Sequence, residues 1–243
     1  MDGLILEGVL RNLERALTGR TLLAWDRLSE WEYLLRFATA AGDNLKISLR
    51  LPFPSLYRLP HRDTPKAADP DFFSGIAARE LEGTVLREIA RLGSDRVVRM
   101  SWERMDGEKR GLVAELLGKS ANLILLDSQE KVIAFAREMD SAFRAPEAGK
   151  PYQAPVARPH LEGAPLDPAR LDGWLARFPP ETAGEASAEF FKFLSPPLAM
   201  DLAQTADPDP ARALKRVLAA AREGRLEPVL YTCLLYTSDA ADE

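Results

Sequence analysis

Hydrophobic residues recur with a helical period at the start of the chain and then change to short runs typical of strands. Leucines at three- and four-residue spacing predict the first helix, which ends at Gly19, a residue that suits a left-handed C-terminal cap. These leucines are Leu6, Leu10, Leu13 and Leu17. Three apolar-rich runs follow and predict antiparallel strands at Thr21–Leu28, Trp31–Ala38 and Leu45–Leu51.

The middle of the chain adds one helix and five strands. Residues 52–70 are rich in proline and polar residues and are predicted as a loop. Asp69 and Pro70 suit an N-cap and a first-turn proline, and they predict a helix over Asp71–Glu82 that stops at Gly83. The five further runs are Thr84–Leu92, Arg96–Met105, Arg110–Leu117, Asn122–Asp127 and Val132–Arg137. The pattern predicts an α+β fold whose antiparallel strands close as a sandwich or barrel.

The rest of the chain differs in character. The β-rich domain is expected to occupy residues 1–155 and to be followed by a proline-rich linker over 156–165. Helical periodicity with tight, proline-containing turns then predicts a small module of the helix-hairpin-helix type over 166–224. Residues 225–232 begin a further segment.

The last eleven residues, 233–243, resemble the translation of a transposase adapter used in DNA library preparation. On this interpretation the natural sequence is legible only to about Thr232, and the single cysteine, Cys233, is not biological. The chain is then expected to be the N-terminal part of a longer protein. The alternative is a genuine polar tail.

Composition and charge restrict the kinds of functional site that this chain can contain. With 32 basic and 37 acidic residues the net charge is −5, so nucleic-acid binding would need a local basic patch. One cysteine and two histidines exclude a disulfide framework and leave little for a metal centre, so neither metal nor cofactor is expected. The acidic N-terminus is unlike a signal peptide, and no apolar run reaches the roughly 20 residues that cross a bilayer. We expect a cytoplasmic protein with no membrane partner.

No catalytic motif is found, and the protein is not expected to be an enzyme. Phosphate-binding loops, dinucleotide-binding turns and nucleophile elbows are absent from the sequence. Its carboxylates, among them Glu80, Glu82, Glu103 and Glu115, are interpreted as mostly solvated surface. Basic residues are frequent from Arg79 to Lys119, with acids between them. They fit either an ordinary salt-bridged sheet surface or a face that contacts phosphates.

Several motifs in a fixed order resemble the N-terminal domain of the NFACT family, whose RqcH-like members also carry the label fibronectin-binding protein A. The clearest is the stretch Glu115–Asp127, which is similar to that family's Glu-Leu-Met-Gly-Lys-His-Ser-Asn-Ile-Ile-Leu motif. Residues 79–83, 92–98 and 193–199 resemble further family segments, and the similarity spans about residues 1–231. Ser120 and Ala121 stand where the family usually has His-Ser, which removes a donor from this loop.

The resemblance implies a factor of ribosome-associated quality control. Such proteins bind tRNA, alanyl-tRNA in bacteria, and large ribosomal subunits that carry an obstructed peptidyl-tRNA, and they support untemplated C-terminal tailing of the stalled chain. It also implies a fold like the N-terminal domain of formamidopyrimidine DNA glycosylases. The family's tRNA-engaging pair falls on Asp95 and Arg96. Further candidate RNA-contacting residues are Arg79, Lys119, Asn122 and Arg144.

Two alternatives belong to other functional classes. A DNA glycosylase is disfavoured because these enzymes use an N-terminal proline as nucleophile, whereas position 2 is Asp2. A fibronectin-binding adhesin is disfavoured because no signal peptide is found. Co-sedimentation with large ribosomal subunits separates the leading hypothesis from both.

Overall fold

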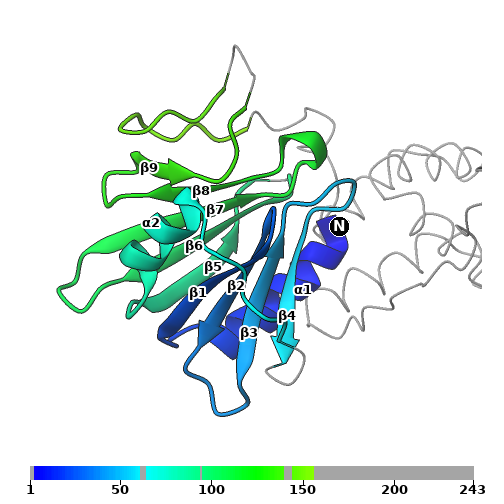
Figure 1. Ribbon diagram of the computed structural model, residues 1–243, viewed down its shortest axis with the longest axis vertical. Helices are drawn as coiled ribbons and strands as arrows, with labels where there is room; N and C mark the ends of the chain where they lie inside the picture. Colours follow the sequence, from blue (N-terminus) through cyan, green and yellow to red (C-terminus); the bar gives the residue numbers. More distant parts are fainter. Residues whose placement is uncertain (1–2, 61–63, 94, 140–143, 156–243) are drawn as a thin grey trace, which may run out of the picture.

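Two antiparallel sheets form the body of the molecule, as predicted (Figure 1). The computed structural model describes residues 3–60, 64–93, 95–139 and 144–155. The first sheet has the order β1-β2-β3-β4. Its strands are β1 (Leu22–Ser29), β2 (Glu32–Phe37), β3 (Asp43–Ser48) and β4 (Ser55–Pro60). The second sheet has the order β5-β6-β7-β8-β9. Its strands are β5 (Val85–Arg91), β6 (Val97–Glu103), β7 (Lys109–Glu115), β8 (Asn122–Leu126) and β9 (Val132–Phe135).

The two sheets are joined by backbone hydrogen bonds at one edge. Thr21, just before β1, forms an antiparallel bridge with Val85 at the start of β5. The amide of Leu22 donates to the carbonyl of Thr84 at 2.9 Å, and further bonds of this kind flank it. Each sheet is a meander in which sequential strands pair, so the fold is an antiparallel α+β sandwich. This confirms the predicted fold class, while the likeness to DNA glycosylases stays a prediction.

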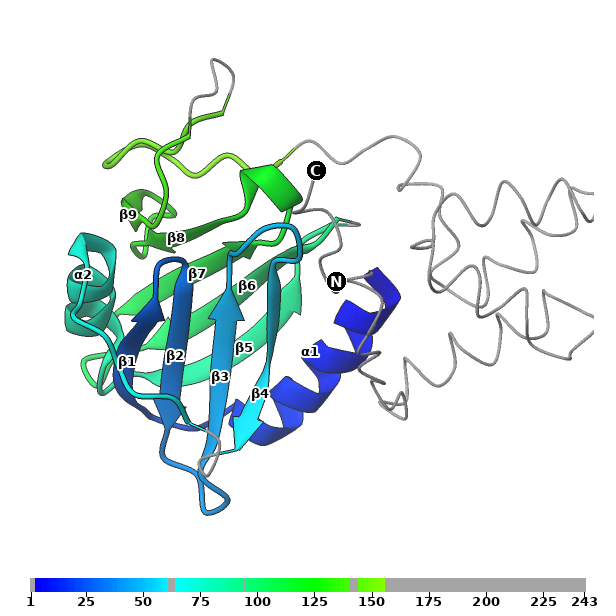
Figure 2. The same cartoon turned by 45° about the vertical axis from the view of Figure 1, so that its right-hand side comes forward.

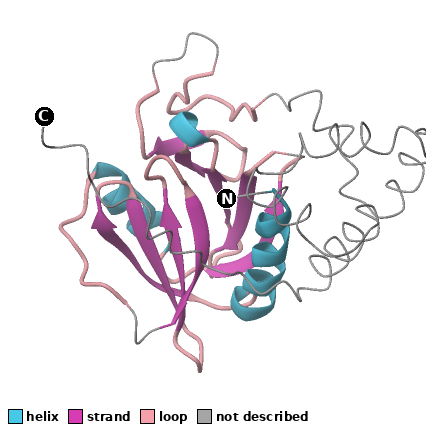
Figure 3. Ribbon diagram, turned by 90° about the vertical axis from the view of Figure 1, so that its right-hand side faces the viewer, coloured by secondary structure: helices cyan, strands magenta, loops and turns pink. Residues whose placement is uncertain are grey.

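Two helices lie on opposite sides of the sandwich (Figure 3). Helix α1 (Gly3–Leu17) packs on β3, β4 and β5, and helix α2 (Phe72–Leu81) packs on β1 and β9. The four leucines that predicted α1 are all buried. Gly19 follows with φ of 79°, the left-handed conformation that its place after the helix predicts.

Two local predictions were wrong. The N-cap of α2 is Asp71, not Asp69, because the Asp71 carboxylate accepts hydrogen bonds at 2.7 Å from both the amide and the hydroxyl of Ser74. The predicted loop over 52–70 contains β4, an edge strand that buries only Leu56. Proline at positions 52, 54 and 60 hides this strand from sequence analysis, because proline is tolerated only at the edge of a sheet.

Aromatic side chains fill the space between the sheets. Phe37 of β2 stacks on Trp102 of β6, with ring centroids 5.8 Å apart and planes at 16°. Trp25, Tyr33 and Phe73 form a second group, with centroids 5.7 to 5.9 Å apart. Because Phe37 and Trp102 belong to different sheets, their contact fixes how the sheets face each other.

The second sheet is buried on its outer face as well. Val97, Val113, Ile124, Leu126 and Val132 form a separate apolar cluster there, and Tyr152 packs against it. The segment 144–155 covers this face, so all five residues of β8 are buried. This explains why β8 has the continuous apolar run of a strand covered on both sides instead of an alternating pattern.

The predicted linker (156–165), helical module (166–224), further segment (225–232) and adapter-like tail (233–243) lie outside the described residues. Within the described ranges, neither helix has the length and apolar character needed to cross a membrane.

Replacing Phe37 by alanine should lower the free energy of unfolding by about 3–5 kcal/mol, because it leaves a cavity against Trp102 at the sheet interface. Urea unfolding of the whole chain measures this. Phe72→Ala is the matched control, since the Phe72 side chain is 82% exposed and its loss should cost little. Equal effects of the two changes would contradict the assignment of Phe37 to the core.

Candidate functional site

One end of the second sheet gathers most of the predicted site residues. Strand register places Val97 opposite Glu115, and Glu115 opposite Asn122. The amide of Leu116 donates to the carbonyl of Arg96 at 2.8 Å. We call this end of the sandwich the rim; it comprises residues 30–31, 49–54, 92–93, 95–96 and 117–121 (Figure 2).

Asp95 and Arg96 lie in the rim, in the turn between β5 and β6. The Asp95 carboxylate accepts a hydrogen bond from the amide of Arg96 at 2.8 Å, and its carbonyl accepts one from Nε of Arg91 at 2.8 Å. Gly93 opens the turn at φ of 64°. The Asp95 side chain therefore shapes the turn, and both Asp95 and Arg96 are half-buried. Arg96 keeps the partial exposure that contact with another molecule requires.

Lys119 is exposed on the short 3₁₀ helix η2 (Gly118–Ser120), which connects β7 to β8. Its ammonium and the Arg96 guanidinium thus belong to neighbouring turns of the rim. Two cations on adjacent turns suit contacts with successive phosphates of a nucleic acid.

Arg144 is committed to an internal ion pair. Glu115 is fully buried, and the two carboxylate oxygens accept from Nη1 and Nη2 of Arg144 at 2.7 and 2.6 Å. The Tyr152 hydroxyl donates to the same carboxylate at 2.8 Å. The hydrogen bond with Glu115 raises the pKa of Arg144, while burial and the charge of Glu115 raise the pKa of Tyr152. Arg144 and Tyr152 are therefore both held on the buried Glu115 carboxylate.

The interpretation of Glu115 as solvated surface was therefore wrong. Glu115 ends a strand whose other residues from Gly111 onward are all buried, and this apolar context was the available signal. Sequence reasoning also assigned no role to Tyr152, which supplies the third member of the cluster.

Asn122 is likewise fully buried and holds backbone groups in place. Its Nδ2 donates to the carbonyl of Arg137 at 2.9 Å, and its Oδ1 accepts from the amides of Leu123 and Arg137 at 2.9 and 3.0 Å. Asn122 and Arg144 were predicted as RNA contacts, but in this arrangement their polar groups face other parts of the chain.

Arg79 lies away from the rim, in the last turn of α2. Its neighbour Glu80 forms ion pairs with Arg79, Arg104 and Arg110. Burial raises the pKa of Glu80, but hydrogen bonds from Arg110 and Arg79 outweigh it and hold the pKa below its usual value. Arg110 and Glu115 lie at opposite ends of β7, about 17 Å apart for a strand rising roughly 3.4 Å per residue.

The basic residues between Arg79 and Lys119 thus fall into two groups, those in ion pairs on the outer and far parts of the sheet and those at the rim. Arg87 pairs with Glu103, and Arg99 pairs with Glu130. Together with the Glu80 cluster, these pairs make the outer and far parts of the sheet an ordinary salt-bridged surface. The phosphate-contacting interpretation applies to the rim alone.

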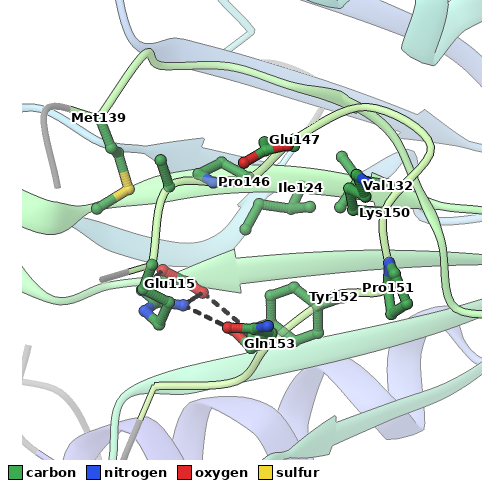
Figure 4. Close-up of a pocket in the computed structure, with 12 residues that line it drawn as sticks. Glu115, Ile124, Val132, Met139, Pro146, Glu147, Lys150, Pro151, Tyr152 and Gln153 are labelled. Atoms are coloured by element: carbon green, nitrogen blue, oxygen red, sulfur yellow. Dashed lines mark hydrogen bonds and ion pairs between the residues drawn. The ribbon is translucent and has the colours of Figure 1, made fainter. Parts of the chain in front are cut away.

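A pocket of about 390 Å³ opens beside the Glu115 cluster, between the second sheet and segment 144–155 (Figure 4). Ile124, Val132 and Met139 line it with Pro146, and Figure 4 shows Gln153 and Tyr152 next to the Glu115 carboxylate. Across the described ranges there is no group of three or more His, Cys, Asp or Glu side chains that could hold a metal ion.

Several solved structures share this fold. The N-terminal part of the fibronectin/fibrinogen-binding protein of Streptococcus suis has a similar structure, with a TM-score of 0.74, 21% identity and coverage of 90% of this chain and 84% of that one. The fibrinogen-binding protein of Staphylococcus aureus gives 0.70, with 20% identity and coverage of 91% and 82%. The N-terminal domain of fibronectin-binding protein PavA of Streptococcus pneumoniae gives 0.66, with 20% identity and coverage of 92% and 82%. At these identities the likeness establishes the shared fold.

The sequence then identifies the family. Residues 2–229 match the NFACT N-terminal and middle domains, and the chain belongs to the NFACT family. It is also 27% identical over 137 residues to the Rqc2 homolog RqcH of Streptococcus suis, a match that covers 54% of this chain. The match covers 25% of that longer relative.

Replacing Arg144 by alanine should lower the free energy of unfolding by about 3–5 kcal/mol, because the Glu115 carboxylate would stay buried without its counter-charge. Adding Glu115→Gln should recover part of the loss, since a neutral amide costs less to bury. Urea unfolding of both single variants and the double variant gives the coupling between the two side chains. Lys150→Ala, which changes an exposed residue of the same segment, is the control. Strictly additive losses would contradict the pairing.

Proposed function

We propose that this protein acts in ribosome-associated quality control and that its rim binds tRNA. Membership of the NFACT family supports the proposal, as does similarity to a relative named Rqc2 homolog RqcH. The single observation that carries it is the place of three residues at one end of the sandwich. Asp95 and Arg96 lie in the turn between β5 and β6, and Lys119 lies on η2, in the neighbouring turn between β7 and β8.

In this proposal Arg96 is the main contact. A guanidinium presents several donors in a plane, so it can bind a phosphate or the edge of an unstacked base in two places at once. The Asp95 carboxylate, bonded to the amide of Arg96, sets the direction in which that side chain leaves the turn. Lys119 adds a point charge for a neighbouring phosphate.

The wider role is part of the same proposal. The protein would bind a large ribosomal subunit that carries an obstructed peptidyl-tRNA and present a tRNA, alanyl-tRNA in bacteria, for untemplated C-terminal tailing. It would act as a binding factor, with no cofactor of its own. Because the match covers a quarter of its curated relative, this role is proposed for the full-length protein.

Changing Arg96 to alanine in the full-length protein should weaken tRNA binding about ten- to a hundredfold, because a charge-assisted contact contributes roughly 1.5–3 kcal/mol. Arg96→Lys should restore little if the contact is bidentate. The measurement is tRNA recovered with the purified protein, together with its melting temperature.

Arg87→Ala is the matched control for that variant. The Arg87 side chain, on β5, is 55% exposed, but it pairs with Glu103 at the end of the sheet away from the rim. The Arg87→Ala change should leave tRNA recovery unchanged. Unchanged recovery in a normally folded Arg96→Ala variant would return Asp95 and Arg96 to a purely structural turn.

Co-sedimentation tests the wider role. The full-length protein should sediment with large ribosomal subunits, and more strongly with subunits carrying peptidyl-tRNA than with vacant ones. Sedimentation with neither would contradict the proposal and leave the adhesin and DNA-binding alternatives, which fibronectin and duplex DNA binding assays then separate.

A further inference from the structure

The loop between β3 and β4 exposes two large apolar side chains that are two positions apart in the chain. Phe53 is 75% exposed and Leu51 is 50% exposed. Their neighbours Leu49 and Pro54 are buried, so the loop is anchored at both ends while its middle stands in solvent. Contiguous exposed apolar residues of this kind mark interaction sites more often than isolated ones do.

The base of this loop is held by the turn between β1 and β2. The amide of Leu49 donates to the carbonyl of Trp31 at 2.8 Å. Trp31 has φ of 67°, a left-handed conformation that non-glycine residues rarely adopt. Its ring lies under the guanidinium of Arg137, 4.8 Å from the centroid, and this contact holds the ring in place.

The same contacts connect the loop to the turn that carries Lys119. Arg137 Nη1 donates to the carbonyl of Ala121 at 3.5 Å, directly after η2. Figures 1 and 2 both show the β3–β4 loop beside η2. The β3–β4 loop, which carries Phe53, and η2, which carries Lys119, are therefore neighbouring segments of the rim.

Charge next to the apolar pair favours a nucleic acid over a protein as its occupant. Arg50 precedes Leu51, and its side chain is 66% exposed. Its Nη1 is 3.7 Å from a Glu32 oxygen, a long contact that a phosphate can replace at small cost. Single-stranded nucleic acids stack their bases on exposed aromatic rings and place their phosphates against nearby cations.

We infer that Phe53 is a stacking platform for one unpaired base of the bound RNA, with Arg50 and Lys119 contacting the phosphates on either side of it. This inference rests on the proposed function and adds to it a site that recognises an unstacked loop or end of the RNA in place of a duplex. Stacking tolerates any base, so this contact adds affinity without selecting a sequence.

The test compares four variants of the full-length protein by their affinity for tRNA. Phe53→Ala should weaken binding about five- to a hundredfold, the range for losing one stacked base. Phe53→Trp should keep or improve it, because a larger ring stacks at least as well. Phe53→Leu should bind as poorly as Phe53→Ala. Phe72→Ala, which removes an equally exposed ring from the start of α2, should bind like the unchanged protein.

Phe53→Trp also supplies a spectroscopic readout. Its additional fluorescence should be quenched on adding tRNA and should not be quenched on adding a fully paired RNA duplex, since only unpaired bases can stack on it. Phe72→Trp is the matched control and should show no quenching.

Each outcome decides the inference. Normal tRNA affinity in Phe53→Ala, with loss in Arg96→Ala, overturns the stacking site and leaves the proposed function standing. Full affinity in Phe53→Leu overturns it too, because it shows that apolar character suffices, as for a protein partner. Absence of tRNA binding by the unchanged protein overturns both. The expected order, Trp and Phe above Leu and Ala, supports the inference.

Discussion

Burial of the Glu115 carboxylate is the constraint on which the functional end of this molecule depends. A carboxylate inside an apolar sheet face is stable only when it is paired, so Arg144 and Tyr152 must dock on it. Docking them brings segment 144–155 across the sheet, where it covers Ile124 and its neighbours. The outer cluster and the two-sided burial of β8 follow from that one requirement.

Strand β8 also holds the rim in its observed geometry. The first residue of β8, Asn122, holds the backbone of Arg137 through both ends of its amide. Arg137 in turn lies over Trp31, whose carbonyl anchors Leu49. A continuous set of polar and aromatic contacts therefore runs from the buried ion pair to the exposed β3–β4 loop. Loss of the Glu115–Arg144 ion pair should therefore disturb the β3–β4 loop as well as the second sheet.

Electrostatics separates the two ends of the second sheet. At the far end a single carboxylate, that of Glu80, forms ion pairs with three arginines, so these arginines are paired within the protein. At the rim, Lys119 and Arg50 are exposed. The exposed acid Glu30 lies in the rim as well, so the two ends of the sheet differ in how completely their basic residues are paired.

Sequence by itself determined the two helices, the strands from Leu22 to Phe135 apart from β4, the antiparallel class and the NFACT family, because periodicity and motif order are local along the chain. It also named Asp95, Arg96 and Lys119, and the structure brings these to one end. Only the tertiary structure decided that Asn122 and Arg144 face inward, since their partners Arg137 and Glu115 are 15 and 29 residues away. Only the tertiary structure also showed that Arg79 lies away from the rim. Burial, ion pairing and the meeting of distant turns depend on contacts between strands, which no single stretch of sequence records.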